Sequence, residues 1–251
     1  MRQLITIPMS HYCEKARWGL DWAGLEWTES AHLQVFHYRA VRQYDANGMV
    51  PVLVDGEEAV ADSTNILLHL DKALPEARKL YPDDLREEIQ QLEEGFDEEL
   101  GIETRRWVYY HWMPLPSRDV LKIAGQGIPG WQRLMAPFMF PMMRRFLAKH
   151  LSISDDNVQT GMALVHKHFD AVAKRLIDGR AFICGDQFTA ADLSFACMAA
   201  PVLLPREYGI RLPTPEEVPA SARTDVDYFR AHPAGQYALK LFRENRQPTA
   251  A

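Results

Sequence analysis

Residues 48–68, GMVPVLVDGEEAVADSTNILL, carry the most informative pattern of this 251-residue chain. The β-branched run at 52–54 is closed by Asp55-Gly56, which predicts a strand that ends in a hairpin turn. A second short strand is expected at 58–61, and a helix over 63–74 follows it. The stretch therefore predicts two antiparallel strands that lead directly into a helix.

The residues that flank these strands have conformational preferences of their own. Pro51 has no N–H to donate to a sheet, so it is expected at an edge or at the first position of a strand. This leaves the backbone of Val50 free to face a ligand. Asp62 or Ser63 is expected to begin the helix, because such side chains accept hydrogen bonds from the unpaired N–H groups of a first helical turn.

Strands and helices alternate through the first 80 residues. Strands are expected at 2–7 and 25–30, with a helix at 13–23 that ends before Gly24. A short helix is placed in the segment that ends at Tyr44. The resulting order, β-α-β-α-β-β-α, indicates a mixed α/β sheet.

The pattern changes at residues 80–84, LYPDD, where a proline and two acidic residues predict a linker followed by a helix start. Beyond it, long helical patterns are expected at 85–112 and 155–177. One or two terminal helices are expected at 225–243. The second part of the chain is therefore predicted to be all-helical.

Segment 113–152 is expected to be an irregular insert, because prolines and glycines recur through it and interrupt any single helix. Its part at 131–146, WQRLMAPFMFPMMRRF, has methionines among aromatic residues. Flexible thioethers suit an adaptable apolar surface, so a lid over a substrate is one interpretation. A basic amphipathic stretch on a membrane is a second, against which the prolines argue. Ordinary packing is a third.

The run GDQFTAAD at 185–192 contains the signature of a helix start. Thr189 and Asp192 have the spacing of a capping box, with Asp in place of the usual Glu or Gln. Phe188 is placed to act as the hydrophobic staple residue. An apolar stretch follows, so a central helix is expected to begin at Ala190.

These motifs together resemble those of the cytosolic glutathione transferase family. The Val50-Pro51 step followed by Asp62-Ser63 is similar to the family's glutathione site, and the pattern at 185–192 is similar to a structural motif of its helical domain. The resemblance implies a thioredoxin-like, glutathione-binding domain at 1–80 and an all-helical substrate domain at 85–251. It also implies glutathione as cosubstrate, a small electrophile as second substrate, and a homodimer.

The resemblance assigns the catalytic position to Ser10, between the first strand and the first helix. In serine-using transferases a Ser there donates a hydrogen bond to the glutathione sulfur, and a helix N-terminus also favours a thiolate. Ser10 as a plain helix cap is the structural alternative. Cys13 is the rival catalytic residue, as a redox thiol or as a packed, inert one. Tyr12 is a further, less favoured hydroxyl donor.

The same resemblance assigns the rest of the glutathione site. The backbone of Val50, at the step to Pro51, would bind the cysteinyl part, and Asp62 and Ser63 would bind the γ-glutamyl end. His37 is our choice for the glycine carboxylate. Where many relatives have Lys directly before Val-Pro, this chain has Met49, which removes one expected cation.

The second substrate is expected to bind between the two domains. Arg106, Trp107 and Tyr110, on the long helix after the linker, are candidates to line this pocket, because aromatic residues supply apolar surface and Tyr a polar group. The alternative for each is a place in the core or in a dimer contact.

Composition limits the remaining possibilities. The net charge of −6 provides no basic surface for nucleic acid. No apolar run approaches the roughly 20 residues that span a bilayer, so membrane contact is not expected. Three widely spaced cysteines suit a reducing, cytoplasmic location better than a disulfide framework. No Cys/His spacing typical of a zinc site is present, and no metal is expected.

The expected function is transfer of glutathione to a small, hydrophobic electrophile, as in detoxification. Two alternatives remain open at this point. One is a non-catalytic binding protein built on the same fold, which the loss of a cation at Met49 favours. The other is a thiol transferase that depends on Cys13.

Overall fold

A computed structural model describes residues 1–44 and 46–246. Its N-terminal part contains a four-stranded sheet with the strand order β2-β1-β3-β4. The strands are β1 (Arg2–Thr6), β2 (Trp27–Ala31), β3 (Val52–Asp55) and β4 (Glu58–Ala61). Strand β1 pairs with β2 in parallel and with β3 antiparallel, and the β3–β4 hairpin is antiparallel as expected.

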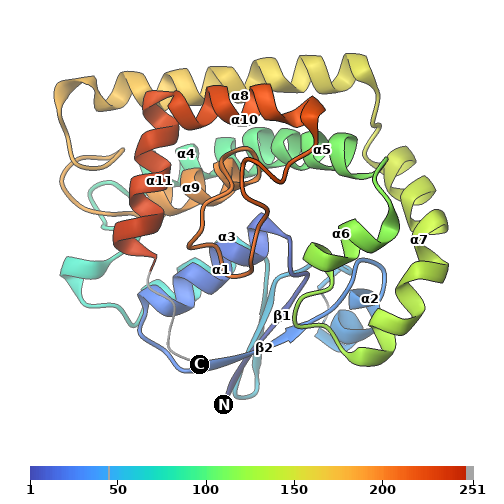
Figure 1. Cartoon of the computed structure of the whole chain (residues 1–251). Helices are drawn as coiled ribbons and strands as arrows, with labels where there is room; N and C mark the ends of the chain where they lie inside the picture. Colours follow the sequence, from blue (N-terminus) through green and yellow to red (C-terminus); the bar gives the residue numbers. More distant parts are fainter. Residues whose placement is uncertain (45, 247–251) are drawn as a thin grey trace.

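Helices cover both faces of this sheet, because successive side chains of a strand point to opposite faces. On one face, Leu4 and Leu53 pack against α1 (His11–Trp22) and α3 (Ser63–Asp71). On the other face, Ile5 and Val52 pack against Val41 of α2 (His37–Val41), which continues as the 3₁₀ turn η1 (Arg42–Tyr44). The first part of the chain is thus a thioredoxin-like α/β layer structure (Figure 1).

Two helix starts in this part are capped by the side chains that the sequence indicates. Ser10 is the N-cap of α1, and its Oγ accepts a hydrogen bond from the Cys13 N–H at 3.3 Å. The helix therefore begins at His11, two residues earlier than expected. Asp62 is the N-cap of α3 and accepts from the N–H groups of Thr64 and Asn65 at 2.9 and 3.1 Å.

The rest of the chain is helical. Its helices are α4 (Arg86–Gly95), α5 (Gly101–Trp112), α6 (Ser117–Ala124), α7 (Gly130–His150), α8 (Asp155–Arg175), α9 (Ala190–Leu203), α10 (Ala220–Ala231) and α11 (Pro233–Asn245). A π-helical turn, η3 (Phe96–Leu100), joins α4 to α5, so one long helical segment runs from Arg86 to Trp112 as predicted. The 3₁₀ turns are η2 (Glu76–Arg78), before this segment, and η4 (Leu176–Asp178), after α8.

Helix α9 is the centre of this bundle, and its start has the expected capping box. The buried Asp192 carboxylate accepts from the Thr189 N–H at 2.8 Å, and also from the Ile183 N–H at 2.8 Å and the Tyr237 hydroxyl at 2.5 Å. The ring of Phe188 stacks at 5.9 Å on Trp18 of α1, so this residue links the helical domain to the first one.

The prediction that 113–152 is irregular is wrong. This segment forms α6 and the 21-residue helix α7, which contains Pro137 and Pro141 (Figure 1, right). Each proline removes one helical hydrogen bond and leaves the carbonyl four residues earlier without a partner. Both prolines are exposed, and so are Arg133 and Pro137 at those earlier positions, so water can solvate the carbonyls. The helix tolerates its prolines because they lie on its outer face.

A buried charge cluster joins the two domains. The Lys15 ammonium of α1 is fully buried and lies 2.7 Å from Glu93 and 2.5 Å from Asp97 of the helical domain. Burial lowers the pKa of Lys15, but these two carboxylates outweigh it and the net pKa is raised. Near the end of the chain, Arg246 pairs with Glu14 of α1 at 2.8 Å.

Candidate functional site

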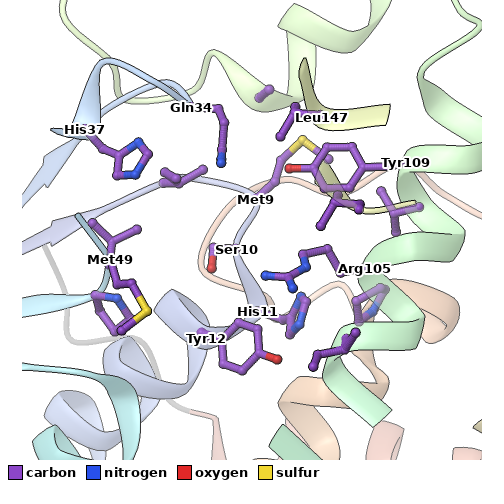
Figure 2. Close-up of a pocket in the computed structure, with 18 of the residues that line it drawn as sticks. Met9, Ser10, His11, Tyr12, Gln34, His37, Met49, Arg105, Tyr109 and Leu147 are labelled. Carbon is purple, nitrogen blue, oxygen red and sulfur yellow. The ribbon is translucent and has the colours of Figure 1, made fainter. Parts of the chain in front are cut away.

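A cavity of about 840 Å³ lies between the two domains. The first domain contributes the N-terminal ends of α1 and α3 and the segment 48–51 to its wall, and the second contributes one face of α5 together with parts of α6 and α7. Figure 2 shows Ser10, His11 and Tyr12 from one side of this cavity and Arg105 and Tyr109 from the other.

Ser10 lies at the wall of this cavity, as predicted, and also caps α1. Its N–H donates to the Ile7 carbonyl at 3.0 Å, and its Oγ accepts from the Cys13 N–H. The cap uses the oxygen of Ser10 as an acceptor, so the hydroxyl proton remains available for donation. The two roles considered for Ser10 are therefore compatible.

The segment before β3 and the start of α3 meet at the same wall. The Val50–Pro51 peptide bond is cis, and the Pro51 carbonyl accepts from the Asp62 N–H at 3.1 Å. The Ser63 side chain is 1% exposed, and its hydroxyl has no hydrogen-bond partner among the described residues. Because buried hydroxyl groups are nearly always hydrogen-bonded, this one is suited to a ligand.

His37 lines the cavity, but not as a cation. It is 3% exposed, its Nε2–H donates to the Gly48 carbonyl at 3.0 Å, and burial lowers its pKa. A neutral ring bonded in this way holds the backbone of the segment that precedes Pro51. Its Nδ1 is buried without a partner in the described part of the chain.

Cys13 lies in the core and not at the cavity wall. Its side chain is fully buried, and its sulfur accepts from the Ile7 N–H at 3.4 Å. Burial raises the pKa of the thiol. Position 13 falls on the face of α1 that packs inward, which explains this placement. The geometry therefore contradicts a catalytic role for Cys13.

The structure also overturns the three predicted pocket residues on α5. Arg106 pairs with Glu103 and donates to the Leu151 carbonyl at 3.1 Å. Trp107 is fully buried, and its Nε1–H donates to Asp225 at 2.7 Å. The Tyr110 hydroxyl donates to Asp155 at 2.8 Å. None of the three is among the cavity-lining residues.

The opposite face of α5 lines the cavity instead. The residues on this face are Ile102, Arg105, Val108, Tyr109 and Trp112. Their spacing of three and four residues is that of a single helical face. The same spacing is present in the sequence, but the residues on the other face are equally aromatic and basic, so periodicity does not say which face is turned to the cavity.

Two aromatic residues next to Ser10 have strongly shifted pKa values. Burial, together with the nearby Arg105 cation, lowers the pKa of His11 to about 3. Burial also raises the pKa of Tyr12 to about 12. The Tyr12 hydroxyl donates to the Asp97 carbonyl at 2.6 Å, so Tyr12 is engaged in joining the domains.

Within residues 1–44 and 46–246, no group of three or more His, Cys, Asp or Glu side chains is arranged to hold a metal ion. No helix of this part of the chain is long and apolar enough to cross a bilayer.

Comparison with known proteins identifies both domains. Residues 4–78 match the family model of the glutathione S-transferase N-terminal domain, and residues 155–222 match that of the glutathione S-transferase C-terminal domain. Among curated proteins, no significant sequence match is found.

Solved structures of glutathione S-transferases share the fold over nearly the whole chain. One from Ceriporiopsis subvermispora, in complex with glutathione, has 16% sequence identity and a TM-score of 0.66. The match covers 100% of this chain and 99% of that structure's chain. One from Methylobacillus flagellatus, with glutathione bound, has 16% identity and a TM-score of 0.61, with 98% of each chain covered. One from Rhodospirillum rubrum has 20% identity and a TM-score of 0.59. The match covers 98% of this chain and 99% of that structure's chain.

Proposed function

Because the chain belongs to the glutathione S-transferase family, we propose that it binds glutathione in the interdomain cavity and activates the thiol for attack on a small, hydrophobic electrophile. The relatives from Ceriporiopsis subvermispora and Methylobacillus flagellatus hold glutathione, which supports the choice of cosubstrate. Removal of electrophiles, as in detoxification, is the corresponding role.

The observation that carries the proposal is the unpartnered, buried hydroxyl of Ser63 on the same cavity wall as Ser10. Ser63 is the first residue of α3, where the helix dipole favours an anion, while Asp62 already accepts from the next two N–H groups. We assign the γ-glutamyl carboxylate of glutathione to this position. Asp62, which precedes it, also lines the cavity and would accept from the ammonium group of the same moiety.

The sulfur of glutathione would then lie near Ser10. Val50, at the cis step to Pro51, also lines the cavity and would bind the cysteinyl backbone. The Ser10 hydroxyl would donate to the thiolate, which also lies at the N-terminus of the 12-residue helix α1. The thiolate attacks an electrophilic carbon, a C–S bond forms, and the leaving group departs with its electron pair.

A non-catalytic binding protein is the second candidate, and one observation favours it. At the position where many members of the family have Lys, Met49 is 58% exposed and carries no charge, while burial lowers the pKa of His37 and favours its neutral form. The glycine end of glutathione would thus be bound without a cation from these residues. Weaker binding of glutathione is the expected consequence.

Ultraviolet absorbance of the thiolate distinguishes the two candidates. We would titrate the purified protein with glutathione across pH, for the wild type, Ser10→Ala and Ser154→Ala. Ser154 is the matched control, because its Oγ caps α8 as Ser10 caps α1, at 3.3 Å in each case, but it is not a cavity-lining residue.

A transferase is expected to ionise bound glutathione at lower pH than free glutathione. Loss of the Ser10 hydrogen bond should raise the apparent pKa of the bound thiol by about 1 to 2, the equivalent of one hydrogen bond to a charged group. Ser154→Ala should leave it unchanged. Saturable binding with an unshifted thiol would support the non-catalytic candidate, and absence of binding would refute both.

We also propose that the protein is a cytoplasmic homodimer, as expected for this family. Its free cysteines, Cys13, Cys184 and Cys197, are all buried and suit a reducing environment. Sedimentation equilibrium would test the dimer, since the chain has a mass of 28.8 kDa. A species near that mass at micromolar concentration would contradict it.

A further inference from the structure

We propose that Arg105, together with His11, forms a subsite for an anionic group on the second substrate. The preferred electrophile would then combine an apolar body with a carboxylate or a similar anion. This inference rests on the proposed function, because it assigns the substrate class of the same cavity.

Arg105 is the only Arg or Lys among the described residues that line the cavity. It projects from α5 toward Ser10 and lies beside His11 (Figure 2). Its guanidinium carbon is 5.8 Å from the centre of the Tyr12 ring, a weak cation–π contact. No carboxylate of the described chain forms an ion pair with Arg105, and its Nε is buried without a hydrogen-bond partner.

Three other cations near this cavity pair with carboxylates, whereas Arg144 of α7 donates to the Leu115 carbonyl at 2.7 Å. Lys15 pairs with Glu93 and Asp97, and Arg17 pairs with Glu29 at 2.6 Å. Arg106, the neighbour of Arg105, pairs with Glu103. Arg105 is half-buried, but its Nε is fully buried, and buried polar atoms are rarely left unpaired. The missing counter-ion of Arg105 is therefore assigned to a ligand.

His11 supplies a second unsatisfied atom at the same place. It is 4% exposed, lines the cavity, and its Nε2 has no hydrogen-bond partner in residues 1–44 and 46–246. The ring is neutral, and with its proton on Nε2 it donates to an anion without adding a second buried charge. Two unpaired nitrogen-bearing groups side by side suit the two oxygens of a carboxylate.

The residues around Arg105 and His11 indicate the chemistry of the rest of the substrate. Apolar residues of α5, α6 and α7 enclose this end of the cavity: Val108, Trp112, Leu121, Phe140, Met143 and Leu147. Glu98 is the nearest acidic wall residue along this helical segment, and it lies seven residues before Arg105, roughly 10 Å along a helix. The γ-glutamyl carboxylate of glutathione is already assigned to Ser63, and its glycine carboxylate to the side of His37 and Met49, away from Arg105 (Figure 2). An anion at Arg105 therefore belongs to the second substrate.

A pair of aryl chlorides tests this preference. The acid is 4-chloro-3,5-dinitrobenzoate, and its methyl ester is the uncharged control compound. In both, the glutathione sulfur attacks the carbon that bears chlorine, a C–S bond forms, the C–Cl bond breaks, and chloride leaves with the bonding electrons. The thiol proton passes to solvent, and the carboxylate or ester is unchanged.

We would measure kcat/KM for both compounds with the wild type, Arg105→Met, Arg105→Lys and Arg106→Met. Arg105→Met should lower kcat/KM for the acid by about 10- to 100-fold, as expected for loss of a charged hydrogen bond, and change that for the ester less than about 3-fold. Arg105→Lys should recover part of the preference, and Arg106→Met should retain it. An equal loss for both compounds would overturn the proposal, because Arg105 would then act on the thiolate.

A binding measurement separates this inference from the proposed function. Quenching of tryptophan fluorescence would report binding of 3,5-dinitrobenzoate and of its methyl ester, with S-methylglutathione present, since Trp112 lines the cavity. Tighter binding of the acid that is lost in Arg105→Met and kept in Arg106→Met supports the subsite even if neither chloride is turned over. Equal affinity of the wild type for acid and ester would refute the subsite, whatever the catalytic activity.

Discussion

Replacement of Lys15 by methionine is expected to destabilise the protein strongly. The Lys15 ammonium donates to Asp97 at 2.5 Å and to the Thr64 hydroxyl at 2.9 Å, and it pairs with Glu93 at 2.7 Å. The side chains of Lys15 and Glu93 are 0% and 2% exposed, and that of Asp97 is 16% exposed. Methionine preserves the volume but leaves two buried carboxylates facing each other without a cation.

Removal of one partner from a buried ion pair costs about 3–5 kcal/mol, because the remaining charge stays desolvated. We expect a loss of this size at pH 7. With a urea m-value of about 3 kcal/mol/M, the midpoint of unfolding would fall by roughly 1–1.7 M. Lys122→Met is the matched control: this lysine pairs with Asp119 at 2.9 Å but is 74% exposed, and such surface pairs contribute at most about 1 kcal/mol.

The loss should also depend on pH. Burial raises the pKa of Asp97, and Lys15 opposes this effect. Without Lys15 the folded-state pKa of Asp97 rises further above the unfolded value of about 3.9, so the folded state binds the proton more tightly than the unfolded chain. A raised carboxyl pKa favours folding below the unfolded pKa, and this advantage is lost as pH rises through the folded pKa. The deficit of the variant should therefore be smaller at pH 4.5 than at pH 8.

Urea unfolding followed by circular dichroism at both pH values measures these quantities. A deficit below 1 kcal/mol at pH 7 would refute the reasoning, because the two carboxylates would then be solvated in the folded protein. A large deficit that is the same at pH 4.5 and pH 8 would show that lost packing, and not uncompensated charge, is the cause.

Two further predictions concern residues outside the cavity. Asp192→Ala removes the acceptor of the capping box with Thr189, so it should lower the stability by about 2–4 kcal/mol; thermal unfolding would check this, and a change below 0.5 kcal/mol would contradict it. Because Cys13 and the other two cysteines are buried with raised thiol pKa values, native protein should react with a thiol reagent far more slowly than protein in denaturant. Rapid labelling of Cys13 in the native state would contradict this prediction and support a redox role for Cys13.

Much of the first domain follows from short-range sequence patterns. The hairpin turns directly after Asp55, at Gly56 with its positive φ, and Asp62 caps α3, because turn and cap preferences depend on a few neighbouring residues. The capping box of Thr189 and Asp192 follows for the same reason. The resemblance to glutathione transferases predicted Ser10, Pro51 and Ser63 as site residues, and the structure brings all three to one cavity.

The missed residues depend on contacts between distant segments. Helix α5 has basic and aromatic residues on two faces, so the sequence does not indicate whether Arg105 or Arg106 faces the cavity. Packing of Trp107 against the core turns Arg105 to the cavity and Arg106 away from it. The same kind of packing buries Cys13, three residues beyond Ser10, the N-cap of α1 at the cavity wall.

Helix α7 shows the same limit of local rules. Prolines normally end helices, but Pro137 and Pro141 lie on an exposed face where the carbonyls that they leave unpaired can be solvated. Turns and caps are local, and their free energies can be inferred from neighbouring residues. The orientation of a helix is set by the burial of one of its faces, and that choice is made by the whole folded chain.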